Sequence, residues 1–587
     1  MYAEKIKSPA DVKRLNESEL TTLAQEMRNA LLTKLSNHGG HIGPNLGMVE
    51  ATIALHYVFN SPTDKMVYDV SHQSYSHKML TGRMFAFLDP NEYDSVTGYT
   101  NIIESEHDFF NVGHTSTSVS LACGLAKARD LKGEKDNIIA IIGDGSLSGG
   151  EALEGLSNAG AMDTNMIIVV NDNEMSIAEN HGGLYKSLKT LRESNGTSSN
   201  NLFKAMGLDY VYVENGNDIQ TLIEAFNSIK DTTHPTVVHI HTLKGKGYAP
   251  AEKDKESWHW GMPFDLETGK PKFEDSTPDY GELTAEFLLK KMEKDPKVVA
   301  ITSGTPTVMG FYPELRKKAG KQFVDVGIAE EHAIALASGI AANGATPVYG
   351  VYSTFIQRTY DQLSQDLCLN NNPAVIPVFM GTLMGMNDMT HLGFFDMAIL
   401  GNIPNLVYLA PTCKNEYFSM LDWAMTQKKH PVAIRVPGGP MIEGDSHQDT
   451  DYSELNKFKT THNGSEIAIL GLGAFFSLAE SVAEKLKSEK GINATVINPR
   501  YITGIDTELL EELKSNHKLV ITLEDGILNG GFGEKIASFY GDSNMKVLNF
   551  GLKKEFADRY NVQELLEENH LTDNQIIEDA IKVLNQN

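Results

Sequence analysis

Short apolar runs alternate with amphipathic or small-residue stretches along the whole chain. The clearest case is 138–177, where the run IIAII ends in GDG at 143–145 and the run MIIVV ends in NDN at 171–173. Strands buried on both faces have such continuous apolar runs, and a helix between two of them predicts a βαβ unit. Both polar clusters then fall at the carboxyl ends of neighbouring parallel strands, the edge at which open α/β sheets bind ligands.

The same alternation continues to the end of the chain and predicts three consecutive α/β domains with mostly parallel sheets. Later buried strands are expected in TVVHIH, FVDV, TPVYGVY, AVIPVF, VAIRVP, EIAIL, ATVIN and KLVITL. Polar stretches at about 265–280 and at 443–454 are typical of linkers. We therefore expect domains at 1–275, 280–442 and 455–587.

Other segments are assigned by composition and by capping residues. The opening 35 or so residues have the pattern of amphipathic helices, with Asn16 or Ser18 as the N-cap. A small-residue helix is expected from Val119 to Ala128. Residues 36–47, rich in Gly and His, are poor in both helix and strand signals. Residues 181–201, rich in Gly, Ser and Asn, are predicted to form a loop.

Composition limits the class of protein. The chain has 587 residues, 41% hydrophobic and 22% charged, with a formal net charge of −26 and no basic stripe. This charge argues against nucleic acid and against an anionic membrane as partners. The three cysteines are scattered, without a CxxC pair, which fits a reducing compartment. The N-terminus lacks the apolar core of a signal peptide, and no apolar run approaches the ~20 residues of a membrane span. We expect a cytoplasmic protein.

Asp144 and Asn173 are the strongest candidates for chemistry. Asp144 lies between two glycines at the end of one strand, and Asn173 follows just under thirty residues later at the end of the next. One carboxylate and one or two carbonyl oxygens suit Mg²⁺ or Ca²⁺ that is also held by phosphate groups. GDG and NDN are also ordinary turn formers, so a surface turn is the alternative for either motif alone.

Several further residues have two interpretations. His41, His72 and His114 lie in Gly/Ser-rich loops, where each alone could be structural. The turn that contains His114 precedes a small-residue helix and is a natural anion site. The turn that starts at Lys244 suits a phosphate or, equally, solvent. Glu330 lies near a helix start, where a negative charge is stabilised by the helix dipole, and this alone could explain a glutamate at that position.

Together these motifs resemble the 1-deoxy-D-xylulose-5-phosphate synthase family of transketolase-like enzymes. The resembling blocks, in the expected order, are DVSHQSYSHKMLTGR, NVGHTSTSVS, the GDG-to-NDNEMSI unit, LKGKGYAPAE, DVGIAEEHA and YSTFIQRTYDQ. The resemblance implies a thiamine-diphosphate-binding fold followed by a C-terminal transketolase domain. It also implies thiamine diphosphate and Mg²⁺ as cofactors, an active site formed by the first two domains of one chain, and a homodimer. The implied reaction is decarboxylation of pyruvate and its condensation with D-glyceraldehyde 3-phosphate.

The resemblance also implies a role for each residue that matches a family motif. The metal would be held by Asp144, Asn173 and the main-chain carbonyl of Met175. The residues that would contact the cofactor are His72, Gly113, His114, Thr115, Gly145, Ser146, Asn173, Tyr248 and Glu330. Glu330 would be the catalytic acid at the aminopyrimidine ring, and the other catalytic residues would be His41, His259 and His391. The substrate pocket would also contain Tyr352, Arg358 and Asn387.

The chain departs from the family pattern at three residues, and its segment between Asn173 and Tyr248 is shorter than is usual in the family. Met380 and Gly438 stand where the family has arginines, which look like its phosphate-binding pair, and Asn387 stands where it has an aspartate. Losing a charge-assisted bond to a phosphate typically costs a few kcal/mol. These changes leave open a transketolase-like or acyloin-forming paralogue with a different donor or acceptor. A non-catalytic binding protein on the same fold is the other alternative, and intact Asp144 and Glu330 argue against it.

Overall fold

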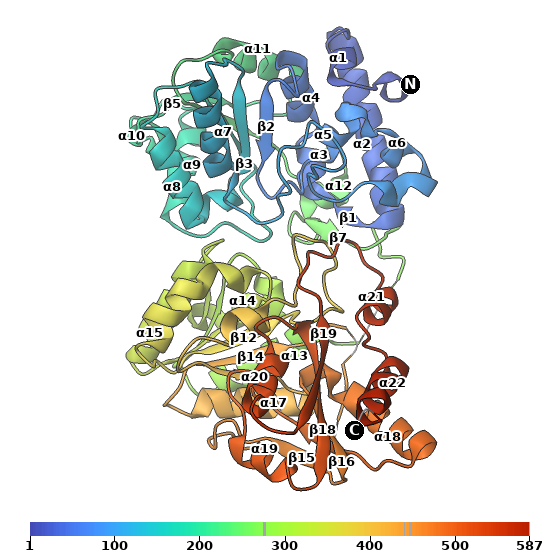
Figure 1. Cartoon of the computed structure of the whole chain (residues 1–587). Helices are drawn as coiled ribbons and strands as arrows, with labels where there is room; N and C mark the ends of the chain where they lie inside the picture. The colour runs from blue at the N-terminus through green and yellow to red at the C-terminus, as the bar shows by residue number, and fades with distance from the viewer. Residues whose placement is uncertain (274–276, 440, 445–448, 586–587) are drawn as a thin grey trace. The chain divides into compact units, whose positions relative to one another are not determined.

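The protein is described here by a computed structural model that covers residues 1–273, 277–439, 441–444 and 449–585. The chain forms two compact units, Met1–Thr277 with Val326–Ala329, and Pro278–Asp325 with Glu330–Asn587 (Figure 1). Both units consist of mostly parallel sheets covered by helices, which confirms the predicted α/β class. Residues 274–276 and 445–448, within the two predicted linkers, lie outside the described residues.

The first unit is built on a five-stranded parallel sheet in the order β2-β3-β4-β6-β5. Its strands are β2 (Lys65–Tyr68), β3 (Ile138–Gly143), β4 (Ile167–Asp172), β5 (Asp209–Val213) and β6 (Thr236–His241). A separate antiparallel pair joins β1 (Gly40–His41) to β7 (Trp260–Gly261). The two apolar runs around GDG and NDN are therefore neighbouring strands, as predicted.

Helices cover both faces of this sheet. Its longer helices are α2 (Glu17–His38), α4 (Val49–Val58), α7 (Ser118–Lys132), α8 (Gly150–Ala159), α9 (Gly183–Glu193) and α11 (Ile219–Ile229). On β3, Ile139 and Ile141 join the core formed with α2, α4 and α11, while Ile138, Ala140 and Ile142 join the core formed with α7 and α8. Burial on both faces explains why β3 has no polar alternation.

Two sequence predictions in this unit were wrong. Residues 181–201 contain helix α9, whose Leu188 and Leu191 are fully buried. Residues 36–47 contain β1 and a short helix, α3 (Gly43–Gly47). Tertiary contacts impose α3 on a weak helical sequence, because Gly43 N donates to Trp258 O at 2.8 Å. By contrast, the predicted N-cap is confirmed: Asn16 forms a capping box with Glu19 at the start of α2.

The second unit contains two sheets. The first has the order β13-β14-β12-β10-β8-β9, with β11 paired to β12, and all its pairings are parallel. Its strands are β8 (Val298–Thr302), β9 (Phe323–Asp325), β10 (Thr346–Tyr349), β11 (Val351–Tyr352), β12 (Val375–Phe379), β13 (Val407–Leu409) and β14 (Val432–Val436). Helices α13 (Tyr280–Met292) and α17 (Lys414–Thr426) share its core, and α15 (Glu330–Ala342) packs against β10.

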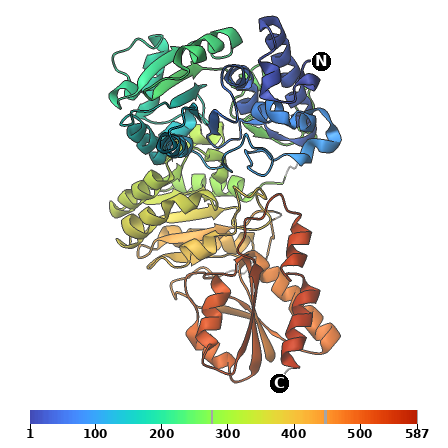
Figure 2. The same ribbon diagram turned by 45° about the horizontal axis from the view of Figure 1, so that its top comes forward.

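The second sheet of this unit has the order β15-β17-β16-β18-β19, in which only the β15–β17 pairing is antiparallel. Its strands are β15 (Lys459–His462), β16 (Glu466–Gly471), β17 (Thr495–Asn498), β18 (His517–Ile527) and β19 (Lys546–Leu552). Its longer helices are α18 (Phe476–Lys490), α20 (Phe532–Tyr540) and α22 (Asp573–Leu584). Figure 2 shows this sheet with helices on both sides.

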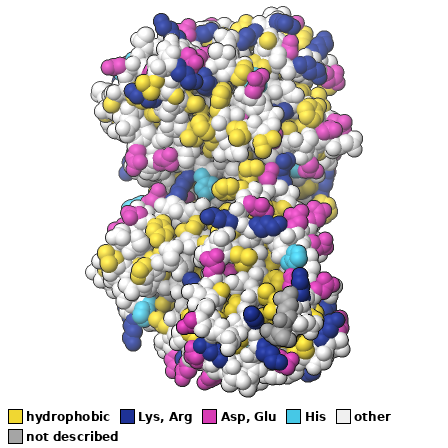
Figure 3. Space-filling view, viewed as in Figure 1, with side chains coloured by type: hydrophobic (Ala, Val, Ile, Leu, Met, Phe, Trp, Pro, Cys, Tyr) yellow, Lys and Arg dark blue, Asp and Glu magenta, His cyan; other side chains and the backbone are white. Residues whose placement is uncertain are grey.

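The visible surface of each unit mixes the two signs of charge. Figure 3 shows Lys and Arg side chains interspersed with Asp and Glu, and no continuous basic stripe on the displayed face. Within the described ranges, every helix is too short or too polar to cross a membrane.

Candidate functional site

Asp144 and the turn at residues 173–176 meet at the carboxyl ends of β3 and β4. Asp144 N donates to Asn171 O at 3.0 Å, and Met175 N donates to Asn173 Oδ1 at 3.2 Å. A Cβ atom on Gly145 would lie 2.9 Å from Ser176 Oγ, so only glycine permits this approach. The three predicted metal ligands are therefore carried by two adjoining turns.

The surroundings of Asp144 fit a cation and an anionic group. Asp144 is 1% exposed, and burial together with the charge of Asp172 raises its pKa well above the ordinary value. Its Oδ2 accepts a 2.7 Å hydrogen bond from Asn180 Nδ2. The buried Oδ1 of Asn180 and Oγ of Ser176 have no hydrogen-bond partner among the described residues. Buried polar atoms are normally paired, so these oxygens and this carboxylate match what Mg²⁺ prefers.

A second loop brings the predicted cofactor turn, 113–115, to the same edge. Asp69, at the end of β2, accepts from Ser116 N at 2.8 Å and from Ser118 N at 3.0 Å. Ser116 Oγ then donates to Ser146 O at 2.8 Å. The contacts of Asp69 and Ser116 thus hold the turn before α7 beside Gly145 and Ser146.

Three predicted histidines form one cluster. The ring centroids of His41 and His72 are 5.0 Å apart, those of His41 and His259 5.6 Å, and those of His72 and His259 5.3 Å. Asn45 ties two of the loops together, since its Nδ2 donates to His41 O and to His72 O. Burial and the charge of Lys244 lower the pKa of His72 to about 3, and the same causes lower the pKa of His259 well below its ordinary value.

Lys244 links the histidine cluster to the Asp144 turns. Its Nζ donates to Ser176 O at 2.6 Å and lies 3.1 Å from His259 Nδ1. The side chain is 1% exposed, and burial lowers its pKa to about 7. The sequence placed Lys244 only in a turn that could bind phosphate or solvent. A buried cation beside this cluster was therefore missed, because its partners are distant in sequence.

Tyr248 lies apart from these groups. Its ring packs against Trp258 and Phe264, and its hydroxyl donates to Leu266 O at 3.2 Å. Among the described residues, these side-chain contacts of Tyr248 do not include Asp144 or the histidine cluster. Its predicted contact with the cofactor stays a prediction.

In the second unit, the short helix η7 (Phe355–Thr359) connects most of the predicted residues. Arg358 on η7 lies 3.4 Å from the carboxylate of Glu330, the first residue of α15. The ring of Phe355, on the same helix, packs against the rings of Tyr352 and His391, with centroid separations of 6.0 Å and 5.7 Å. Burial raises the pKa of Glu330, while the nearby Arg358 guanidinium opposes that shift. Arg358 therefore already has a carboxylate partner.

Asn387 faces a different neighbour. Its Nδ2 donates to Tyr560 O at 3.2 Å, and its own carbonyl accepts from Arg559 N at 2.6 Å. The structure thus pairs this predicted substrate residue with the chain after β19.

Full-length relatives decide the family. The chain is 38% identical to the 1-deoxy-D-xylulose-5-phosphate synthase of Carboxydothermus hydrogenoformans, over 98% of this chain and 97% of that protein. It is 39% identical to the enzyme of the same name from Caldanaerobacter subterraneus, over 98% of each chain. The Halalkalibacterium halodurans enzyme is 37% identical over 100% of this chain and 99% of its own. The chain belongs to the 1-deoxy-D-xylulose-5-phosphate synthase family.

Matches to separate parts of the chain agree with this membership in the synthase family. The pattern described as 1-deoxy-D-xylulose-5-phosphate synthase matches residues 3–201 and 193–242. The patterns described as the transketolase pyrimidine binding domain and the transketolase C-terminal domain match 276–439 and 456–576. The resemblance inferred from the motifs is confirmed, and the paralogue alternative is not favoured.

Two of the three substituted positions, Met380 and Gly438, lie next to each other. A Cβ atom on Gly438 would lie 2.7 Å from Met380 Sδ and 3.1 Å from Thr382 Cγ2. Met380 itself has a φ of 55°, an uncommon backbone conformation for a residue other than glycine. The methionine thioether therefore occupies the space that any side chain at position 438 would need.

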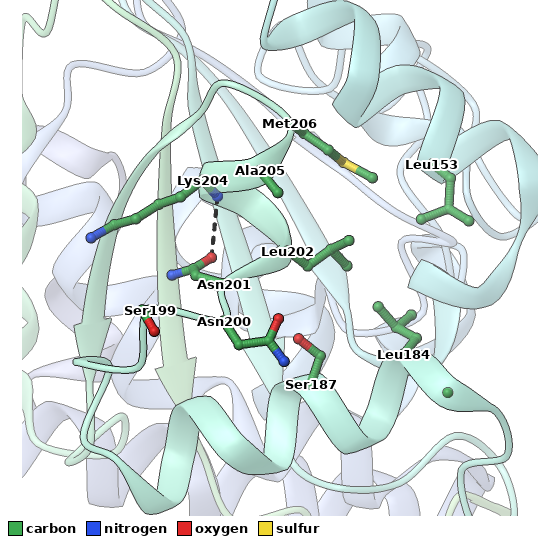
Figure 4. Close-up of a pocket in the computed structure, with 11 residues that line it drawn as sticks. Leu153, Leu184, Ser187, Ser199, Asn200, Asn201, Leu202, Lys204, Ala205 and Met206 are labelled. Carbon is green, nitrogen blue, oxygen red and sulfur yellow. Dashed lines mark hydrogen bonds between the residues drawn. The ribbon is translucent and has the colours of Figure 1, made fainter.

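One cavity of about 750 Å³ lies outside all of these groups. It is formed in the first unit by α8, α9 and the segment 199–206, which contains α10 (Leu202–Ala205) (Figure 4). Leu153, Leu184 and Leu202 contribute apolar side chains to its wall (Figure 4). No predicted site residue lines it, so we assign it no part in the synthase chemistry.

Proposed function

We propose that this chain is a 1-deoxy-D-xylulose-5-phosphate synthase, which decarboxylates pyruvate and condenses the two-carbon unit with D-glyceraldehyde 3-phosphate. The proposal is supported by the buried position of Asp144 next to the Asn173–Met175 turn. It is also supported by the similarity of the chain to synthases of this name over nearly its whole length. Thiamine diphosphate, when bound, supplies an electron sink for the electron pair that pyruvate releases with CO₂.

The first unit would bind the cofactor's diphosphate. Asp144, Asn173 and the carbonyl of Met175 would hold Mg²⁺, which neutralises the diphosphate charge. The residues proposed to contact the cofactor here are His72, Gly113, His114, Thr115, Gly145, Ser146 and Tyr248. A buried carboxylate with a raised pKa costs free energy when it is ionised without a cation, so Asp144 fits this role.

The remaining residues would handle protons and substrate. Glu330 would hydrogen-bond a ring nitrogen of the aminopyrimidine, from a buried position that excludes water. His41, His259 and His391 would donate protons to, or accept them from, the oxygens of the reacting carbonyl groups. Tyr352, Arg358 and Asn387 are proposed to line the substrate pocket. A homodimer, a cytoplasmic location and domain limits at 275, 280, 442 and 455 stay predictions of the resemblance and of the sequence pattern.

The test is product identification. Purified protein with thiamine diphosphate and Mg²⁺ receives pyruvate with or without D-glyceraldehyde 3-phosphate, and CO₂ release and product mass are measured. We expect deoxyxylulose phosphate, with faster CO₂ release when the aldehyde is present. Release of CO₂ without that product would overturn the proposed acceptor, and no release with bound cofactor would overturn the proposed reaction.

A further inference from the structure

Lys244 is a buried cation that none of the roles above uses. Its backbone is fixed on both sides, because Leu243 N donates to Asn217 Oδ1 at 2.8 Å and Gly245 N donates to Gly43 O at 3.0 Å. A Cβ atom on Gly43 would lie 3.2 Å from Lys244 Cγ, so the glycine leaves room for the lysine stem. The fold therefore places the ammonium group at one defined point.

At that point the ammonium has two acceptors. One is the Ser176 carbonyl at 2.6 Å, and the other is His259 Nδ1 at 3.1 Å. A protonated lysine has three donors and no lone pair, so a hydrogen bond to His259 requires an unprotonated Nδ1. The proton of a neutral His259 then resides on Nε2.

We propose that Lys244 is a positioning residue that fixes the tautomer of His259, so that a neutral imidazole presents its Nε2–H to a substrate oxygen. This role rests on the proposed function, in which His259 acts on the reacting carbonyl groups. A donor held in one tautomer needs no reorganisation when negative charge develops on that oxygen.

The electrostatics agree with this geometry. After burial, the charge of Lys244 is the largest cause of the low pKa of His259, with smaller effects from His72 and His41. The ammonium group therefore both selects the tautomer and disfavours a second proton on the ring. A neutral imidazole donor is a known electrophile in enzymes that stabilise oxyanions.

The tautomer can be measured directly on the wild-type enzyme. The ¹⁵N shifts of the histidine rings distinguish Nε2–H from Nδ1–H, and the His259 signals are identified by their loss in His259→Gln. We expect Nε2–H in the wild type and in Lys246→Met, a control in the same turn whose side chain is partly exposed. In Lys244→Met we expect a mixture of tautomers. An Nδ1–H signal in the folded wild type would overturn the proposal, whatever product the enzyme makes.

Kinetics test whether Lys244 acts through His259. Lys244→Met is expected to lower kcat by about 10-fold or more, an effect similar to losing the hydrogen-bond partner that orients a metal-bound histidine. Lys244→Arg is expected to restore part of kcat. KM for pyruvate and the Kd for thiamine diphosphate should change less than about threefold. In a His259→Gln background, the same lysine change should cost less than about twofold. An equal loss in both backgrounds, or an effect confined to cofactor affinity, would contradict this role.

Discussion

At Glu330 two opposing effects act on one carboxyl group. Burial raises its pKa, and the Arg358 guanidinium at 3.4 Å lowers it. The side chain is 3% exposed at the first position of α15. We expect Glu330→Gln to lower kcat by about 100-fold or more, because the amide keeps the shape but cannot exchange a proton with the cofactor ring. Thiamine diphosphate affinity, measured by fluorescence titration, should change little.

Glu331 is the matched control for this prediction. It follows Glu330 in the same first turn and is only partly buried. Each carboxylate gains about 0.3–1 kcal/mol from the helix dipole, so either substitution removes a similar amount. If Glu331→Gln lost as much turnover as Glu330→Gln, charge at the helix start would explain both, and the catalytic role of Glu330 would be wrong.

The pair Met380 and Gly438 tests how this chain binds a phosphorylated acceptor. An arginine at each position would add charge-assisted bonds to a phosphate, so the double variant Met380→Arg, Gly438→Arg should lower KM for D-glyceraldehyde 3-phosphate. Gly438→Arg alone should gain less, because its Cβ would lie 2.7 Å from Met380 Sδ. An unchanged KM in the double variant would mean that other residues already hold the phosphate.

At the scale of elements, the strands and helices that could be predicted are those with a clear local pattern of hydrophobic residues. The runs that form β3 and β4 are continuous and apolar, so both strands were identified, together with the GDG and NDN motifs at their carboxyl ends. Helix α9 was missed because Gly, Ser and Asn obscured its leucine spacing, and Arg192 holds it from its end by bonds to Asp172 and Glu174. Lys244 was missed for a different reason, because its partner Ser176 is 68 residues away in sequence.

The connection between β18 and α20 makes a prediction about pH. Glu524, 0% exposed on β18, accepts from Phe532 N and Gly533 N at 2.8 Å each, at the start of α20. Burial outweighs these bonds and raises its pKa from 4.5 to about 7. An acid with a raised folded-state pKa keeps its proton longer in the folded chain. The free energy of unfolding therefore falls as pH rises between those two values.

Glu524→Gln should remove this pH dependence. We expect the thermal midpoint of the variant, relative to that of the wild type, to rise from pH 5 to pH 8. Glu534→Gln is the control, because Glu534 also accepts a backbone bond, from Gly530 N at 2.8 Å, but is exposed. A relative midpoint that stays constant with pH in Glu524→Gln would show that this carboxyl group does not titrate in that range.

At the scale of the whole molecule, two units with separate cores divide the proposed roles, and thermal unfolding with two transitions would reflect that division. A ligand that binds only the folded first unit raises the free energy of unfolding of that unit, and the gain grows with the logarithm of the ratio of ligand concentration to Kd. The charge of Asp144 makes the stability of this unit depend on a bound cation. Without a cation its ionised carboxylate is buried near Asp172, which Arg192 and His239 keep charged.

Asp144→Asn should therefore change stability in opposite directions in the two states. Without ligands at pH 8, the variant should melt higher than the wild type, because it no longer buries a charge that burial and Asp172 both disfavour. With saturating thiamine diphosphate and Mg²⁺, the wild type should gain several degrees and the variant little, because asparagine supplies no negative charge to the cation. Asp163→Asn is the control, since Asp163 is exposed in the same βαβ unit and should respond to ligands as the wild type does. A ligand-induced shift that is equal in Asp144→Asn and the wild type would place the cation elsewhere in the chain.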